Sequence, residues 1–237
     1  MREKPNPDPR GKSTIYNPPY FQSFSSLAEA NIVGRFASAG PMKRLGLLII
    51  FLWSSVVWPQ SAKPRTPALP PELEPVRAAL EKYQDPIVAI HDGYLSTVGC
   101  ADFPHDPQPG HEQYPRGAMG IHFLNPSLIG PSIDPLHPQI LLYEPVGGKF
   151  QLVGAEWFVP LSTGVKERPQ LLGHPFWGPM EGHEPLMPSE LKHYDLHVWL
   201  FKGNPNGVFA PTNPNVKCTG YPYDVQMHST RHLAATH

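Results

Sequence analysis

Proline is the residue that most limits what this chain can fold into. The sequence contains 32 prolines among 237 residues, whereas an average protein has about 5%. Proline fixes φ and lacks a backbone N–H, so it interrupts helix interiors and central strands. Hydrophobic residues still make up 40% of the chain, which is enough for a core. The composition therefore predicts a folded, loop-rich domain with few long helices.

The histidines and most acidic residues follow residue 62. Residues 1–62 contain 7 Lys and Arg, 3 Asp and Glu and no histidine. Residues 63–237 contain 12 Lys and Arg, 17 Asp and Glu and all 12 histidines. The formal net charge of the whole chain is −1. A nucleic-acid-binding protein normally shows a basic excess or a basic stripe, so we expect no nucleic-acid partner.

A basic and then apolar segment begins at an internal methionine. Met42-Lys43-Arg44 precedes a run of 14 mostly apolar residues at 45–58, which ends before Pro59. This order is typical of a secretory signal peptide, which we predict over residues 42–62. The alternative is a membrane anchor, which needs about 20 apolar residues. We therefore expect a secreted or periplasmic protein that meets the membrane only transiently, through its signal peptide.

The signal segment sets the expected boundaries of the other parts. Residues 1–41 show no helical or strand periodicity, and we predict an over-extended, disordered N-terminus with Met42 as the true start. A genuine disordered tail is the alternative. Residues 63–71 indicate a proline-rich linker. The rest predicts one domain over 72–220 and a loose C-terminal tail over 221–237.

Fusing residues 42–62 to a reporter tests the export prediction. The reporter should be exported because a basic region and an apolar region together address a chain for secretion. The fusion of residues 1–41 alone is the control and should stay in the cytosol. Retention of the 42–62 fusion, or a mature protein that begins before Met42, would contradict the prediction.

Apolar periodicity predicts helices first and strands afterwards. An apolar stripe at helical spacing runs from Val76 to Tyr83, and Asp85 can cap a second short helix whose Ile87, Ile90 and Tyr94 should face the core. We expect an α+β fold, with an N-terminal helix or helix pair packed on a mainly antiparallel β-sheet or small barrel. Strands are predicted at 119–124, 140–144, 150–159 and 193–202, and loops at 100–116 and 160–192.

Two cysteines, Cys100 and Cys218, are predicted to form a disulfide. Export places them in an oxidising compartment, where disulfides form and persist. A bond that closes a loop of over a hundred residues is worth about 4–5 kcal/mol by the chain-entropy argument. Two free thiols are the alternative, because sequence alone gives no distance between the residues.

The run HYDLHV at 193–198 carries the clearest chemical signal. Alternate residues of a strand share a face, so His193, Asp195 and His197 lie on one side and Leu196 on the other. Neutral imidazole is the commonest protein metal ligand. Asp195 can ligate, or orient a histidine by accepting its other ring proton. The pattern predicts a site for a single transition-metal ion, and nitrogen-rich donors suit Zn, Cu, Ni or Fe.

Further polar residues interrupt apolar runs. His122, Glu144 and Glu156 lie in predicted strands, where a buried polar group needs a partner, and either glutamate would complete the ligand set or act as a base. The alternatives are a hydrogen-bonded core histidine and buried salt bridges. The predicted ligands are His122, His193, His197, Glu144 and Glu156, and the residues expected to orient them are Asp195 and His183.

Several of these runs also resemble one family. The runs are GAMGIHFLNP, ILLYEP, LVGAEWFV, GHEPLMP and HYDLHVWLFKGNPNGVFAPTNP, together with the final Cys218. They are similar to recurrent motifs of a family of uncharacterised exported bacterial proteins, over residues 75–218. The resemblance implies that the candidate ligands lie within these motifs, and it implies no activity.

Three kinds of function remain. The first is an exported metal-binding protein, which is an enzyme if an open coordination position activates water or dioxygen. The second is a non-catalytic module with an apolar pocket for a small molecule or glycan, and the third is a structural envelope protein. The aromatic residues considered for such a pocket are Trp157, Trp177, Trp199, Tyr143 and Tyr194.

Overall fold

The helices of the domain are short, as the proline content predicts. The computed structural model describes residues 68–233; the predictions for residues 1–41 and 42–62 lie outside them. The helical segments are η1 (Pro71–Leu73), α1 (Glu74–Leu80), η2 (Glu81–Gln84), α2 (Pro86–His91), η3 (Pro126–Leu128) and η4 (Leu161–Thr163). The strands are β1 (Leu95–Phe103), β2 (Gly117–Leu124), β3 (Ile140–Val146), β4 (Lys149–Pro160), β5 (Gln170–Leu171), β6 (His174–Pro175), β7 (Trp177–Met180), β8 (His193–Val198) and β9 (Asp224–Gln226).

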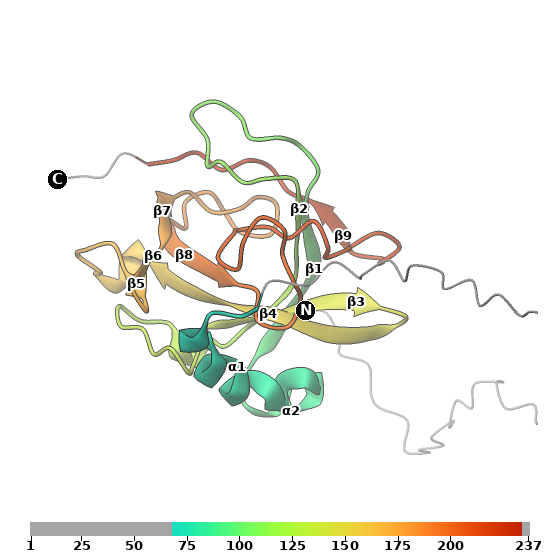
Figure 1. Cartoon of the computed structure of the whole chain (residues 1–237). Helices are drawn as coiled ribbons and strands as arrows, with labels where there is room; N and C mark the ends of the chain where they lie inside the picture. The colour runs from blue at the N-terminus through green and yellow to red at the C-terminus, as the bar shows by residue number, and fades with distance from the viewer. Residues whose placement is uncertain (1–67, 234–237) are drawn as a thin grey trace, which may run out of the picture. The chain divides into compact units, whose positions relative to one another are not determined.

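Within residues 68–233, seven strands form one curled sheet in the order β7-β8-β4-β3-β2-β1-β9, and β5 and β6 form a small second sheet (Figure 1). All neighbouring pairs are antiparallel except β1 and β9, which are parallel. The predicted α+β class with a mainly antiparallel sheet is confirmed. No helix in this part of the chain is long and apolar enough to cross a membrane.

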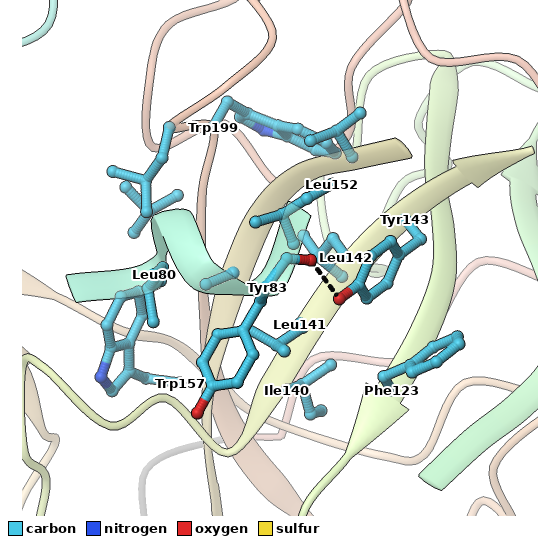
Figure 2. Close-up of a cluster of buried hydrophobic side chains, with 14 of the residues drawn as sticks. Leu80, Tyr83, Phe123, Ile140, Leu141, Leu142, Tyr143, Leu152, Trp157 and Trp199 are labelled. Carbon is cyan, nitrogen blue, oxygen red and sulfur yellow. Dashed lines mark hydrogen bonds between the residues drawn. The ribbon is translucent and has the colours of Figure 1, made fainter. Parts of the chain in front are cut away.

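The helix stripe packs against the middle of the sheet. Leu80 and Tyr83 lie over the apolar side chains of β3 and β4, where Trp157 and Tyr143 are fully buried (Figure 2). The Tyr143 hydroxyl donates a hydrogen bond of 2.7 Å to the Tyr83 carbonyl oxygen. The helical segment is held in place because these large aromatic side chains are buried between it and the sheet and the Tyr143 hydroxyl has a hydrogen-bond partner.

The second helix is capped as predicted but turned differently. The Asp85 carboxylate accepts a hydrogen bond of 2.9 Å from the Ile87 backbone N–H. Of the three residues predicted to face the core, Tyr94 is buried, but the prediction is wrong for Ile87 and Ile90, which are 68% and 50% exposed. Ala89 is buried instead, because α2 has only six residues and its approach to the sheet, rather than its own periodicity, selects the buried face.

The hairpin of β3 and β4 is confirmed. Gly147 and Gly148 connect the two strands with φ of 56° and 77°, a left-handed conformation that two-residue hairpin turns require and glycine adopts without strain. By contrast, β1 was not predicted. Its sequence LSTVGCADF lacks alternation, and a register irregularity between Ser96 and Cys100 interrupts its pairing with β2.

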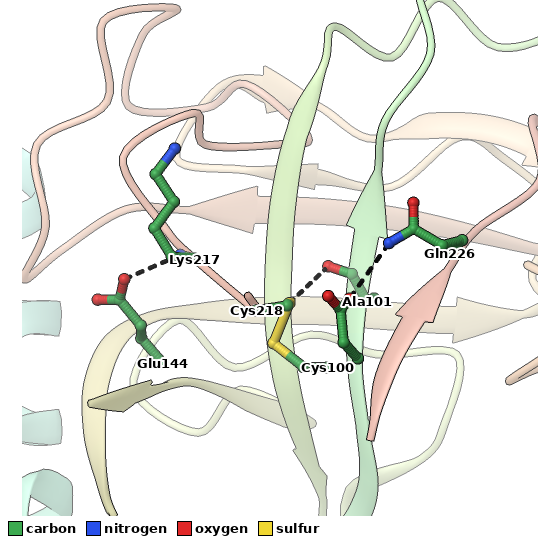
Figure 3. Close-up of a disulfide and its surroundings, with 7 residues drawn as sticks. Cys100, Ala101, Glu144, Lys217, Cys218 and Gln226 are labelled. Atoms are coloured by element: carbon green, nitrogen blue, oxygen red, sulfur yellow. Dashed lines mark hydrogen bonds between the residues drawn. A yellow bond between two sulfur atoms is a disulfide. The ribbon is translucent and has the colours of Figure 1, made fainter. Parts of the chain in front are cut away.

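The disulfide between Cys100 and Cys218 is confirmed. It links β1 to the segment that follows β8, with a Cα–Cα distance of 5.6 Å and a sequence separation of 118 residues (Figure 3). Both residues are buried. The bridge therefore joins two parts of the domain that lie far apart in the sequence.

The predicted loose tail is partly structured, which corrects the sequence-based boundary at residue 221. Strand β9 pairs with β1, and the Glu112 backbone N–H donates a hydrogen bond of 2.8 Å to the Thr230 carbonyl oxygen. Residues 234–237 lie outside the described part. The tail shows no local periodicity because its contacts are with distant parts of the chain, namely β1, the loop at 100–116 and the segment at 179–184.

Both faces of β8 are buried. Leu196 and Val198 pack in the main core, whereas His193, Asp195 and His197 on the other face are 0–1% exposed. The reason is that β8 is an interior strand between β4 and β7, and the curled sheet covers its polar face as well. The predicted alternation is thus present, but its polar face is enclosed by protein.

Candidate metal centre

The first group of candidate ligands comes from β2, β4 and β8. Glu156 is the register partner of His197, and the curl of the sheet brings in His122 from β2. The Glu156 Oε2 atom lies 3.2 Å from His122 Nε2 and 3.5 Å from His197 Nε2. We call His122, Glu156 and His197 the first triad. The His122 side chain is 15% exposed, whereas the other two are 4% or less.

Three atoms of the first triad are buried without a hydrogen-bond partner in the described residues. Glu156 Oε2 and both ring nitrogens of His197 make no hydrogen bond within residues 68–233. A buried polar atom left unsatisfied costs about 1–3 kcal/mol. A cation among these atoms would contact Oε2 and one nitrogen directly and remove most of this cost.

The charge state of the first triad suits a cation. Burial by itself would raise the pKa of the Glu156 carboxyl, but His197 and His122 beside it hold this pKa below its usual range. The carboxyl is therefore ionised at neutral pH. Metal ligands bind in this deprotonated state.

A second group lies on the same face of β8. His193 and Asp195 meet His183, which the loop between β7 and β8 supplies. The distances are 3.3 Å between the two Nε2 atoms, and 3.5 Å and 3.7 Å from His183 Nε2 and His193 Nε2 to Asp195 Oδ2. We call His183, His193 and Asp195 the second triad. In each triad the ligand atoms all lie within 4.8 Å of one another.

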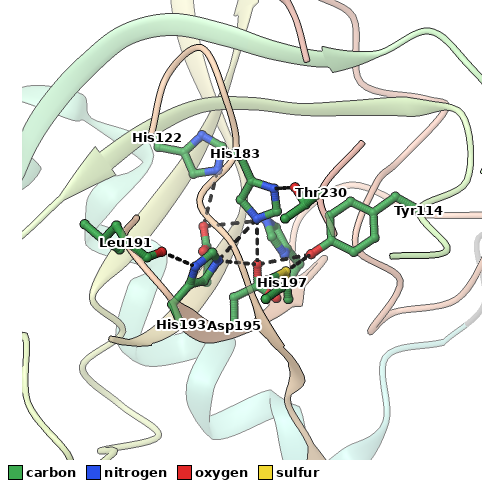
Figure 4. A network of polar contacts seen from close by, with 10 residues as sticks. Tyr114, His122, His183, Leu191, His193, Asp195, His197 and Thr230 are labelled. Carbon is green, nitrogen blue, oxygen red and sulfur yellow. Dashed lines mark hydrogen bonds and ion pairs between the residues drawn. The ribbon is translucent and has the colours of Figure 1, made fainter. Parts of the chain in front are cut away.

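Other residues hold the second triad in position (Figure 4). His193 Nδ1 lies 3.1 Å from the Leu191 carbonyl oxygen, and His183 Nδ1 lies 2.7 Å from Thr230 Oγ1. The Tyr114 hydroxyl is 3.4 Å from Asp195 Oδ2. Burial raises the pKa of Tyr114 well above its ordinary value, so the phenol stays protonated and donates.

Electrostatics favour neutral histidine and ionised aspartate in the second triad. Burial lowers the pKa of His183. Burial would raise the pKa of Asp195, but His183 and His193 beside it hold this pKa well below its usual range. A neutral imidazole beside a carboxylate is the combination that binds divalent transition metals.

The loop that carries His183 is closely packed. At Gly182 an added Cβ would lie 1.9 Å from the Pro188 carbonyl oxygen, so only glycine fits. The His183 carbonyl oxygen accepts a hydrogen bond of 2.8 Å from the Met187 N–H, and the Glu184 carbonyl oxygen accepts one of 3.2 Å from the His228 N–H. The loop is therefore fixed by its own turn and by the C-terminal segment.

The structure divides the predicted ligands differently from the sequence-based prediction. His122, His197 and Glu156 meet, while His193 joins Asp195, which is expected to ligate or to orient a histidine, and His183, which is expected to orient the ligands. Tyr114 and Thr230 were missed, because one lies in a predicted loop and the other in the predicted loose tail. No local pattern marks either residue.

Glu144 does not reach either triad, which corrects its predicted role. It contacts the Lys202 ammonium group and accepts a hydrogen bond of 2.9 Å from the Lys217 backbone N–H, beside the disulfide (Figure 3). The register partner of Glu156 on β3 is Ile140. Glu144 is four residues further along the strand, which is about 13 Å, and this separation explains why it is absent from the site.

The aromatic residues considered for a ligand pocket lie mainly in the core. Trp157, Trp199 and Tyr143 are buried. Trp177 lines a pocket of about 440 Å³ together with Phe176 and His174. Trp199 lines another pocket, of about 460 Å³, together with Lys202 and Arg77. A small-molecule site that uses one of the predicted aromatic residues therefore falls on one of these two pockets.

No protein-family model, curated protein or solved structure matches this chain. The assignment of function therefore depends on the chemistry of the described residues. Buried histidine and carboxylate groups that can hold a metal ion are the main chemical feature of residues 68–233.

Proposed function

We propose that this chain is an exported metal-binding protein that holds a transition-metal ion at the first triad. The observation that carries the proposal is the set of three buried atoms, Glu156 Oε2 and both His197 nitrogens, that make no hydrogen bond within the described residues. Glu156 Oε2, one His197 nitrogen and His122 Nε2 lie within 4.8 Å of one another. Protein interiors seldom leave such groups without a counterpart.

The donor set narrows the class of metal. Two imidazole nitrogens and one carboxylate suit Zn, Cu, Ni or Fe(II), and both catalytic zinc and non-haem iron sites use this combination with an open position. Such an ion would supply Lewis acidity toward bound water. The His122 side chain is partly exposed, so solvent approaches the ion from the His122 side. The buried Glu156 carboxylate orients the two histidines and neutralises part of the charge of the ion.

Export is the second part of the proposal. The segment at 42–62 has the layout of a signal peptide, and the Cys100–Cys218 bond suits an oxidising compartment. The two features are independent of each other. Together they support a secreted or periplasmic protein.

Elemental analysis of the full chain, purified without a polyhistidine tag and reconstituted with Zn²⁺ or Co²⁺, tests the metal proposal. The Glu156→Gln variant keeps the side-chain shape but loses the charge, so the first triad should bind more than ~100-fold more weakly, since even residues that only orient ligands contribute 10–100-fold. The metal content should fall by one ion per chain. His91→Ala is the control, because that side chain is 87% exposed.

Two results would count against this assignment. A parent protein without metal after reconstitution would overturn metal binding and favour a small-molecule site at the pocket of Trp177 or that of Trp199. A folded Glu156→Gln variant with the metal content and affinity of the parent would remove the first triad from consideration. Near-ultraviolet circular dichroism reports whether the variant retains its packed core.

A further inference from the structure

We infer that the second triad binds a second transition-metal cation, so that the polar face of β8 carries a two-metal centre. The inference rests on the proposed function and extends it. The separations of 3.3, 3.5 and 3.7 Å between the ligand atoms are its first support. Ligand atoms 2.0–2.1 Å from a tetrahedral ion lie about 3.4 Å from one another.

The tautomer of His193 is the second support. A carbonyl oxygen only accepts hydrogen bonds, so the contact with Leu191 requires the proton on Nδ1 of His193. In neutral imidazole the other nitrogen then carries a lone pair. This lone pair faces His183 Nε2 and the Asp195 carboxylate. Metal-ligating histidines are commonly oriented in this way, through a backbone carbonyl on the outer nitrogen.

His183 completes the same arrangement. Its Nδ1 contacts the Thr230 hydroxyl, which leaves Nε2 directed into the triad. A proton on that nitrogen would satisfy one contact at most. The other carboxylate oxygen, Asp195 Oδ1, is buried and has no hydrogen-bond partner in the described residues. A cation that binds the two nitrogens and the carboxylate accounts for all three groups.

Each triad holds a buried carboxylate of its own. Glu156 and Asp195 are both buried, and within residues 68–233 their ion-pair partners are histidines alone, with no Lys or Arg. Buried carboxylates are normally paired or coordinate a metal. Because Asp195 and His197 are two residues apart on one strand, the triads are adjacent, and one cation in each triad would give each carboxylate its own counterion.

The two sites differ in enclosure. The side chains of the second triad are 8% exposed at His183 and fully buried at His193 and Asp195. The loop at 181–191 and the C-terminal segment with Thr230 close it. Closed sites are typical of structural metals and open sites of catalytic ones. The second ion is thus the permanent, structural member of the pair, and the first triad keeps the open position.

Titration of Co²⁺ or Zn²⁺ into the metal-free full chain, with ion counting by elemental analysis, tests the inference. The parent should bind two ions per chain. Asp195→Asn and Glu156→Gln should each retain one, and the double variant should retain none. Thr230→Val preserves shape and removes the hydroxyl, so it should weaken the second site about 10–100-fold and leave the first unchanged. His232→Ala is the matched control from the same C-terminal segment and should bind two.

The outcomes separate the two proposals. One ion that is lost in Glu156→Gln and kept in Asp195→Asn overturns the second site and leaves the proposed function intact. One ion lost in both variants means a single shared site and also overturns the inference. No ion in the parent overturns both. The unfolding midpoint of each metal-free variant shows whether a loss of bound metal is due to misfolding. If Asp195→Asn does not fold, the affinity of the second site in Thr230→Val, the smallest of these changes, tests the inference.

Discussion

The double variant Cys100→Ser/Cys218→Ser should lose about 4–5 kcal/mol of unfolding free energy relative to the oxidised parent. The bond spans 118 residues, so its absence enlarges the unfolded ensemble greatly. It also connects β1, which has an interrupted ladder, to the segment after β8. For a domain of this size the midpoint of thermal unfolding should fall by roughly 10–20 °C.

Denaturant unfolding with and without reductant measures this effect. Reductant should destabilise the parent and leave the double variant unchanged. Because serine buries a hydroxyl where sulfur was, the Cys100→Ala/Cys218→Ala variant is the matched control for polarity. An unchanged midpoint, or two alkylatable thiols in protein taken from the periplasm, would contradict the prediction.

His197→Ala should reduce metal binding and Leu196→Ala should reduce stability, because the two residues lie on opposite faces of β8. His197→Ala removes a ligand from the first triad and should abolish binding of that ion, since among the described residues only His122 and Glu156 remain in this group of ligand atoms. Leu196→Ala leaves a cavity in the core, where Leu196 is 1% exposed, and should cost about 2–5 kcal/mol. Its metal content should equal that of the parent in whatever fraction folds.

Metal content and unfolding midpoint, measured on the same preparations, separate these effects. The metal-free His197→Ala variant should unfold close to the metal-free parent, because the change also removes two unsatisfied buried nitrogens. If His197→Ala bound metal as the parent does, or lost it only through unfolding, His197 would be a core histidine and not a ligand.

The sequence by itself determined the features that depend on neighbours along the chain. The stripe from Val76 to Tyr83, the cap at Asp85 and the turn at Gly147 follow from local periodicity and backbone preference. The alternation in β8 follows from the geometry of a strand. The disulfide was predictable because only two cysteines exist in the chain.

Only the tertiary structure decided how the candidate ligands are grouped. His122 meets Glu156 because the sheet curls, Glu144 is excluded by its position along β3, and Thr230 reaches His183 through a tail that pairs with β1. Strands β1 and β9 escaped prediction for the same reason. Contacts between residues far apart in the chain are set by register, curvature and burial of the whole domain, and short sequence windows contain none of these quantities.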